Sequence, residues 1–314
     1  MTSGAASQAP GAARHAGDAD PILEIHALRK SYGDFTLRDA SFSVPRGYIM
    51  GLVGPNGAGK TTSVKLLLNL IRRDAGEIRV FGLDARQEEV AIKARIGFVH
   101  ERPAFYEHVT VAGMGEVAAP FYPDWDRALF RRLAAEFDLP LHKRVGALSR
   151  GMRTKLALAL AMAHHAELLV LDEPTSGLDP VFRRELLERL SAYIQDGKRS
   201  VLFSTHITSD LERIADYVTF IREGRVMFST TKDQVLERWG IVKGGPEMLD
   251  ADTRRFFKGV EASTVGFTGL TDDLEAARRR FSGAGVVIER ASLEDIMVYL
   301  GKGCEATRTC ERCC

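Results

Sequence analysis

A glycine-rich segment between an apolar run and an amphipathic stretch constrains this chain more than any other feature. Residues 54–61 read GPNGAGKT and match the pattern G-x-x-x-x-G-K-[ST] without a mismatch. Residues 48–53 are typical of a buried parallel strand, and residues 61–71 carry apolar side chains at helical spacing. Backbone N–H groups in such a turn, backed by a helix N-terminus, can hold a phosphate chain. The order of strand, glycine loop and helix therefore predicts a phosphate site on an α/β scaffold.

The loop and the first helical residues after it form the predicted nucleotide-binding set. Lys60 can reach the β- and γ-phosphates of a nucleotide, and the Thr61 hydroxyl can ligate Mg²⁺. The alternative is a chance glycine turn, which the flanking strand and helix disfavour. The predicted binding residues are Gly54, Pro55, Asn56, Gly57, Ala58, Gly59, Lys60, Thr61 and Thr62.

A pair of carboxylates follows a second apolar run. Residues 168–171 read LLVL and predict a buried strand, with Asp172 and Glu173 at its end. Because ligands bind at the carboxyl ends of parallel strands, we expect Asp172 near a metal ion. Glu173 can accept a proton from an attacking water. Such a pair alone would more often be a solvated loop, but the phosphate loop upstream favours a catalytic role.

Strand and helix patterns alternate along most of the chain. Residues 22–33 and 38–44 predict an antiparallel edge sheet, and strands at 96–99, 167–172 and 200–205 predict a parallel sheet covered by helices. The remaining expected elements are helices at 153–163, 181–194, 272–281 and 293–300, a hairpin at 217–228, and strands at 265–267 and 286–288. The expected divisions are a disordered segment (1–20), a nucleotide-binding domain (21–240) with a helical subdomain (about 102–165), a small α+β accessory domain (241–301) and a cysteine-containing tail (302–314).

Charge and hydropathy exclude several classes of protein. Lys and Arg total 43 and Asp and Glu total 42, a net charge of +1, which argues against the basic surface of a nucleic-acid-binding protein. No apolar run approaches the roughly 18–20 residues that span a bilayer, and residues 1–20 lack the centre of a secretory signal. We therefore expect a cytoplasmic protein with no nucleic-acid partner. The four cysteines, all within residues 304–314, could bind zinc or act in redox chemistry, although an incidental end is favoured.

Four further features occur in a defined order with the phosphate loop and the carboxylate pair. Residues 148–152 read LSRGM, residues 176–179 read SGLD, His206 follows an apolar strand, and Tyr32 lies near the start. With the phosphate loop and the carboxylate pair, they make the chain resemble the ATP-binding subunit of an ATP-binding cassette (ABC) transporter over about residues 22–239. The resemblance implies a P-loop NTPase (RecA-like) fold, ATP and Mg²⁺ as ligands, and ATP hydrolysis coupled to transport.

The resemblance also implies roles for individual residues and partners for the chain. Two subunits, identical or related, would face each other head to tail, with each ATP between the phosphate loop of one and Ser149 and Gly151 of the other. His206 would hydrogen-bond the γ-phosphate, Glu173 would polarise the water, and Tyr32 would stack on adenine. Closure of this dimer around ATP would drive an integral membrane permease. The permease would hold the chain on the cytoplasmic face of the plasma membrane.

Two segments depart from the usual pattern of this family. Arg150 stands where the signature usually has glycine, and Met152 stands where glutamine is frequent. Glu101 stands where most members carry a glutamine; its carboxylate can ligate Mg²⁺ but, when ionised, cannot donate a hydrogen bond. Residues 120–126 (PFYPDWD) and 293–296 (LEDI) resemble the ABC-2-type export group, which favours an exporter over an importer.

Other interpretations of the sequence remain open. A soluble ABC ATPase acting on the ribosome or DNA is disfavoured by the single cassette and the absence of a heptad array. A nucleotide sensor that does not hydrolyse ATP is disfavoured by the presence of Glu173 and His206. Individually, Ser149 could be only a helix N-cap, His206 could simply end a strand, and Tyr32 could be a packing residue. The sequence does not indicate the transported substrate.

Overall fold

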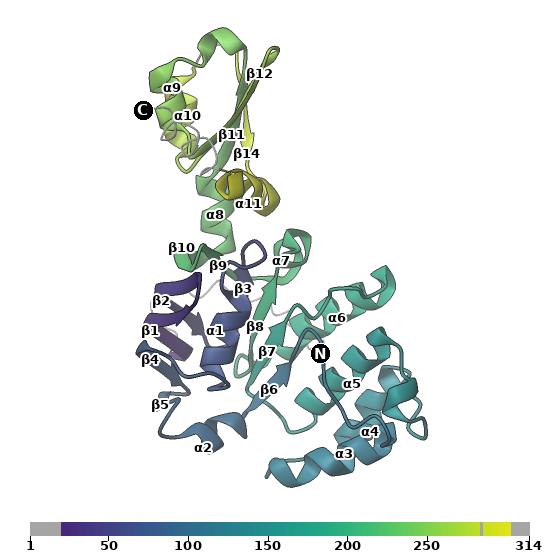
Figure 1. Cartoon of the computed structure of the whole chain (residues 1–314). Helices are drawn as coiled ribbons and strands as arrows, with labels where there is room; N and C mark the ends of the chain where they lie inside the picture. Colours follow the sequence, from purple (N-terminus) through teal and green to yellow (C-terminus); the bar gives the residue numbers. More distant parts are fainter. Residues whose placement is uncertain (1–19, 283–284, 303–314) are drawn as a thin grey trace, which may run out of the picture.

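The fold is built around a six-stranded, mainly parallel sheet. Its strands are β3 (Ile49–Val53), β6 (Ile96–Val99), β7 (Leu168–Asp172), β8 (Ser200–Thr205), β9 (Tyr217–Arg222) and β10 (Arg225–Thr231). The computed structural model describes residues 20–282 and 285–302, and in it these strands have the order β10-β9-β3-β8-β7-β6. All neighbours pair in parallel except β10, which is antiparallel to β9. The predicted α/β fold class with a parallel core is confirmed (Figure 1).

Helices and a second sheet bury both faces of the central sheet. The helices around it are α1 (Lys60–Leu67), α5 (Arg150–Met162), α6 (Pro180–Tyr193) and α7 (Thr208–Ile214). Leu169 and Leu171 of β7 belong to the hydrophobic cluster of α5, α6 and α7, whereas Leu168 and Val170 belong to that of α1. Because successive strand residues point to opposite faces, a strand covered on both sides is a continuous apolar run. The LLVL run of β7 therefore does not alternate between apolar and polar residues.

The second sheet is antiparallel and packs on the α1 side. Its strands are β1 (Pro21–Tyr32), β2 (Phe35–Pro45), β4 (Ala75–Val80) and β5 (Leu83–Asp84), in the order β2-β1-β4-β5. The sequence predicts the pairing of β1 with β2 but misses β4, whose buried Ile78 and Val80 lie opposite Ile25 and Leu23. The helix predicted to reach residue 71 ends at Leu67 instead, and Asn69 follows with a left-handed φ of 52°.

A helical region extends from the carboxyl end of β6. Between β6 and α5 it contains α3 (Val111–Ala118), η1 (Ala119–Phe121), α4 (Arg127–Glu136) and η2 (Val145–Ala147), whereas the short helix α2 (Glu89–Lys93) precedes β6. Side-chain caps set the helix starts: Thr110 accepts the Gly113 amide, and Asp126 accepts the Leu129 amide. Residues 120–126 thus fall between α3 and α4. The prediction that α5 starts at residue 153 is wrong, because Ser149 caps a helix that begins at Arg150.

The C-terminal region forms a third sheet with its own helices, at the opposite end of the molecule from α3 and α4 (Figure 1). Its elements are α8 (Lys232–Arg238), β11 (Gly240–Gly244), η3 (Pro246–Met248), α9 (Ala251–Phe256), β12 (Gly259–Ser263), β13 (Gly266–Thr271), α10 (Leu274–Arg280), β14 (Val287–Arg290) and α11 (Leu293–Lys302). The strand order is β12-β13-β11-β14, and every pair is antiparallel. The sequence predicts β13, β14, α10 and α11 but misses β11, β12 and α9.

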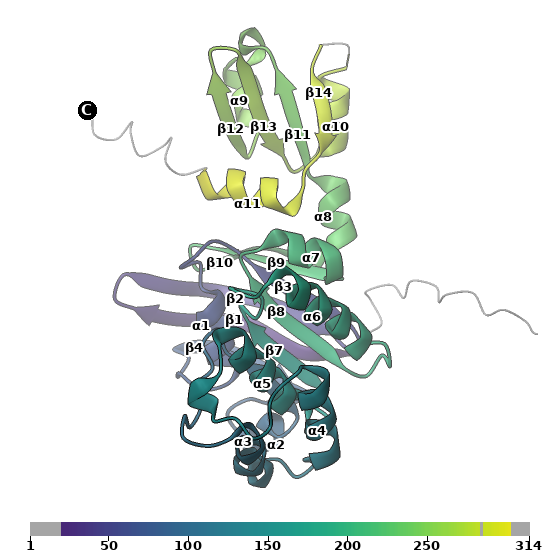
Figure 2. The ribbon, with the colours of Figure 1, turned by 90° about the vertical axis from the view of Figure 1, so that its right-hand side faces the viewer.

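Helix α11 connects this C-terminal region to the central sheet. It lies across the end of the third sheet, next to α7 (Figure 2). The Leu293 amide at its start donates a 2.8 Å hydrogen bond to Oε1 of Glu212 on α7. Leu293 and Ile296 share one hydrophobic cluster with Leu211 and Ile214 of α7. The apolar core is therefore continuous between the two regions.

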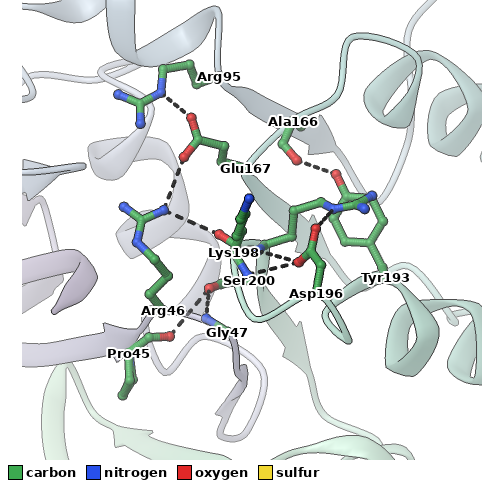
Figure 3. Close-up of polar contacts among 11 residues, drawn as sticks. Pro45, Arg46, Gly47, Arg95, Ala166, Glu167, Tyr193, Asp196, Lys198 and Ser200 are labelled. Carbon is green, nitrogen blue, oxygen red and sulfur yellow. Dashed lines mark hydrogen bonds and ion pairs between the residues drawn. The ribbon is translucent and has the colours of Figure 1, made fainter. Parts of the chain in front are cut away.

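Polar contacts tie together the amino ends of the central strands. Glu167, just before β7, accepts a 2.6 Å hydrogen bond from Nε of Arg95 and a 3.1 Å bond from Arg46 (Figure 3). The hydrogen bond from Arg95 holds the pKa of the Glu167 carboxyl below its usual value, with smaller help from Arg46. Nearby, the Tyr193 hydroxyl donates to the Ala166 carbonyl. These polar groups at the amino ends of the strands are therefore engaged with one another.

Some sequence predictions lie outside the residues that the structure describes. These are the segment 1–19 and the four cysteines Cys304, Cys310, Cys313 and Cys314. Within residues 20–282 and 285–302, none of the helices has the length and apolar character needed to cross a membrane.

Candidate nucleotide-binding site

A cavity of about 670 Å³ opens where four parallel strands end. Its walls come from the segments that directly follow β3, β6, β7 and β8, with an aromatic edge from the β1–β2 turn. Open α/β sheets bind ligands beyond the carboxyl ends of their strands, so this position fits the expectation from the sequence. The lining residues are Tyr32, Phe35, Asn56, Gly57, Ala58, Gly59, Lys60, Thr61, Thr62, Glu101, Glu173, Ser176 and His206.

The phosphate loop wraps around the side chain of Lys60. Lys60 is 5% exposed, and its ammonium donates hydrogen bonds to the carbonyls of Gly54 (2.8 Å) and Pro55 (3.4 Å). Gly57 and Gly59 adopt φ values of 78° and 114°, which a side chain would strain. Gly54 is required for another reason, because a Cβ there would lie 2.1 Å from the Ile221 carbonyl oxygen. The backbone is thus shaped around one cation at the N-terminus of α1.

Asp172 lies beneath the loop and contacts two hydroxyl groups. Its Oδ1 accepts hydrogen bonds from Oγ1 of Thr61 (3.2 Å) and from Oγ of Ser204 (2.5 Å). The residue is 1% exposed, and its buried Oδ2 has no hydrogen-bond partner among the described residues. A buried, unpaired carboxylate oxygen beside a hydroxyl is suited to a hard cation such as Mg²⁺. Ser204 is a contact that the sequence interpretation misses.

Glu173 joins Lys60 to His206 across the cavity. Its Oε1 lies 3.4 Å from Nζ of Lys60, and its Oε2 lies 2.8 Å from Nδ1 of His206. The Glu173 backbone has φ 51°, a left-handed conformation that is costly for a residue with a side chain. Its amide is held by the Ser204 carbonyl at 2.9 Å. The strained turn after β7 therefore places the carboxylate inside the cavity.

Two aromatic rings flank the opening of the cavity. Tyr32 is 43% exposed, and Phe35 faces it as its cross-strand partner at the β1–β2 turn. The sequence interpretation names Tyr32 and misses Phe35. The missed signal is the tight turn Gly33–Asp34, which pairs the residues on either side of it. Ser176 is a second missed lining residue, just after the carboxylate strand.

Ser149 and Gly151 are not among the residues that line this cavity. They lie at the N-terminus of α5, where the Ser149 hydroxyl accepts the Met152 amide at 3.3 Å. Ser149 is therefore an N-cap within one chain. Glu101 does line the cavity and contacts Arg150, so the two departures from the family pattern lie next to each other.

The family model and the similar proteins point to the same family. The model of the ABC transporter family matches residues 37–176. The chain is 32% identical over 300 residues to the Nod factor export ATP-binding protein I of Neorhizobium galegae, covering 88% of this chain and 84% of that protein. It is 28% identical over 294 residues to the bacitracin transport ATP-binding protein BcrA of Enterococcus faecalis, covering 90% and 96%.

A solved structure supports the same assignment. An ATP-binding subunit of an ABC transporter superposes with a TM-score of 0.67 at 27% identity, over 90% of this chain and all of that one. The likeness therefore includes the C-terminal region as well as the central sheet. Together with the cavity at the strand ends, these findings identify the chain as a member of the ABC transporter family and, within it, as a subunit that binds and hydrolyses ATP.

Proposed function

We propose that this chain hydrolyses ATP with Mg²⁺ and thereby drives export of a substrate through a separate membrane permease. The observation that carries the hydrolytic part is the convergence of Lys60, Glu173 and His206 on one cavity from three different strand ends. The direction of transport is supported by relatives that are named for bacitracin transport and Nod factor export. The resemblance of residues 120–126 and 293–296 to the ABC-2-type export group agrees with it.

The residues around the phosphate loop fit a Mg²⁺–nucleotide complex. Thr61 and Asp172 would hold Mg²⁺, with Glu101 approaching from the end of β6; the unpaired Oδ2 of Asp172 is the free acceptor for it. Among the described residues no group of three or more metal-ligating side chains gathers, as expected for Mg²⁺, which takes phosphates and waters as its other ligands. Bound there, Mg²⁺ would neutralise the charge that develops on the phosphates.

The remaining cavity residues divide binding and hydrolysis between them. Residues 54–62, which include Lys60, would hold the phosphates, while Tyr32 and Phe35 would contact the adenine. Glu173 would accept the proton of the attacking water, and His206 would hydrogen-bond the γ-phosphate. The 2.8 Å contact between these two residues would hold each of them in place beforehand.

A second subunit would complete the site. Ser149 and Gly151 lie outside the chain's own cavity, at an exposed helix start, and are free to meet nucleotide on a second copy or a related subunit. A helix N-terminus attracts anions, which suits this role. We further propose that residues 21–240 form the ATP-binding domain, with a helical subdomain at about 102–165, and that residues 241–301 form the accessory domain. Docked on its permease, the chain would lie at the cytoplasmic face of the plasma membrane.

The proposal is tested on the full chain copurified with its permease and reconstituted in inside-out vesicles. We expect Mg²⁺-dependent phosphate release and movement of substrate into the vesicle lumen, both abolished by Glu173→Gln. Hydrolysis without Mg²⁺ would contradict the metal assignment. Movement of substrate out of the lumen would contradict export and leave the ATPase assignment intact.

A further inference from the structure

Glu101 and Arg150 form one ion pair in this structure. Nη2 of Arg150 lies 3.9 Å from Oε1 of Glu101. Glu101 follows β6 and lines the cavity, whereas Arg150 is the first residue of α5. A glutamine and a glycine at these two positions would form no ion pair. The two departures are therefore a single structural feature.

The guanidinium of Arg150 also lies against the loop that follows β7. A Cβ built on Gly177 would be 3.2 Å from Nη1 of Arg150 and 3.3 Å from Cζ. Gly177 has φ 73°, and Ser176 before it lines the cavity. One side chain therefore joins the start of α5, the loop after β7 and a carboxylate at the cavity.

Glu101 lines the cavity and also contacts two arginines, its sequence neighbour Arg102 and Arg150 of α5. Nε of Arg102 is 3.7 Å from the same Oε1, but Arg102 is its neighbour in sequence and moves with it. Arg150 belongs to another element, so its contact restrains Glu101 relative to α5. The side chains of Glu101 and Arg150 are 38% and 53% exposed, and exposed ion pairs are weak. A divalent cation in the cavity can therefore compete for this carboxylate.

We propose that Arg150 is a positioning residue for Glu101, and that Mg²⁺–ATP in the cavity competes with Arg150 for this carboxylate and frees the start of α5. The inference rests on the proposed Mg²⁺–ATP site. The freed segment carries Ser149 and Gly151. Nucleotide in a chain's own cavity thus prepares that chain to contact nucleotide on a second subunit.

The test measures the Mg²⁺ concentration at which the full chain shows half-maximal binding of a fluorescent ATP analogue. Arg150→Gln removes the competing cation and should lower this concentration about two- to fivefold, the range expected for one exposed ion pair. Arg150→Lys keeps the charge and should remain near the unaltered chain. Glu101→Gln should raise the concentration, and adding Arg150→Gln to it should have no further effect.

A matched control is available on the same helix. Arg153 pairs with Glu107 at 3.0 Å, so Arg153→Gln loosens α5 without touching Glu101 and should leave the Mg²⁺ requirement unchanged. No shift with Arg150→Gln, an equal shift in the Glu101→Gln background, or an equal shift with Arg153→Gln would overturn the inference. Loss of Mg²⁺-dependent binding in the unaltered chain would overturn the proposed site itself.

Discussion

The ammonium of Lys60 lies 3.4 Å from a carboxylate oxygen of Glu173, and both side chains are more than 90% buried. The cation of the phosphate loop and the carboxylate after β7 therefore balance each other inside the cavity. Removing one partner of such a pair leaves the other charge buried and uncompensated. Substitutions in the site consequently need a stability measurement beside the functional one.

Glu173→Gln should retain ATP binding and lose turnover. Glutamine fits the same space but cannot take a proton from water, so we expect at least a 100-fold fall in phosphate release. Binding should be unchanged or tighter, because a negative charge near the phosphates is lost. Phosphate-release assays and equilibrium binding of ATP check the two parts. Glu275→Gln, at an exposed position of α10, is the control, and hydrolysis by Glu173→Gln at the unaltered rate would refute the assignment.

Lys60→Ala should weaken ATP binding. A charge-assisted hydrogen bond contributes about 1.5–3 kcal/mol, which corresponds to a roughly 10- to 100-fold rise in the ATP dissociation constant. Titration calorimetry measures the change, and thermal unfolding shows whether the unpaired Glu173 destabilises the fold. Lys65→Ala, on the same helix α1 but outside the cavity lining, should bind ATP normally. An unchanged affinity in Lys60→Ala would exclude the loop as the phosphate site.

Gly54→Ala should destabilise the whole chain. The new Cβ would lie 2.1 Å from the Ile221 carbonyl, a rigid backbone atom of β9, so the loop and the strand must separate. Overpacking of this kind costs about 1–3 kcal/mol, and the melting temperature should fall by several degrees. Gly301→Ala is the control, since a Cβ there meets nothing within 4 Å. Equal melting temperatures for the two variants would contradict this account.

The stability of the fold should fall in mild acid because of His164. Burial lowers the pKa of this imidazole, which is stacked on Tyr122 and contacts the Ile96 and Leu160 carbonyls. Below the unfolded pKa of about 6.5, the unfolded chain takes up a proton that the folded chain resists, so stability present above that pH is lost as the pH falls.

Thermal unfolding at pH 7.5 and pH 5.5 measures this effect. His164→Phe keeps the stack on Tyr122 and should show a smaller loss of melting temperature between the two pH values than the unaltered chain. His142→Ala, on the exposed loop after α4, should show the same loss as the unaltered chain. An identical pH dependence in all three chains would show that His164 does not control it.

The parts of the site that the sequence reveals are those encoded locally. Asp172 directly follows the apolar run LLVL, because a strand buried on both faces needs apolar residues throughout, and the glycine loop that carries Lys60 follows the apolar strand β3. His206 directly follows strand β8. The polar residue that ends such a run is then conspicuous. A shared sheet edge brings these run ends together, which is a consequence of parallel pairing.

The parts that the sequence conceals depend on tertiary approach or on weak patterns. Contact between Glu101 and Arg150 arises because β6 and α5 pack side by side, which no local pattern indicates. Strand β11 begins and ends in glycine, and β12 also begins with glycine, a residue that weakens any strand signal. Strand β4 does alternate, but its exposed Glu77 and Arg79 obscure the two buried residues.

The hydrogen bond from Leu293 to Glu212 and the apolar side chains shared by α7 and α11 limit how such proteins can be recombined. The α7 helix starts two residues after His206, so the segment that follows this cavity residue also packs against the C-terminal region. A chimaera that takes its C-terminal region from a related protein must therefore also take the matching residues of α7. Without a matching α7, apolar side chains of both α7 and α11 would be exposed to solvent, and the chimaera would tend to aggregate.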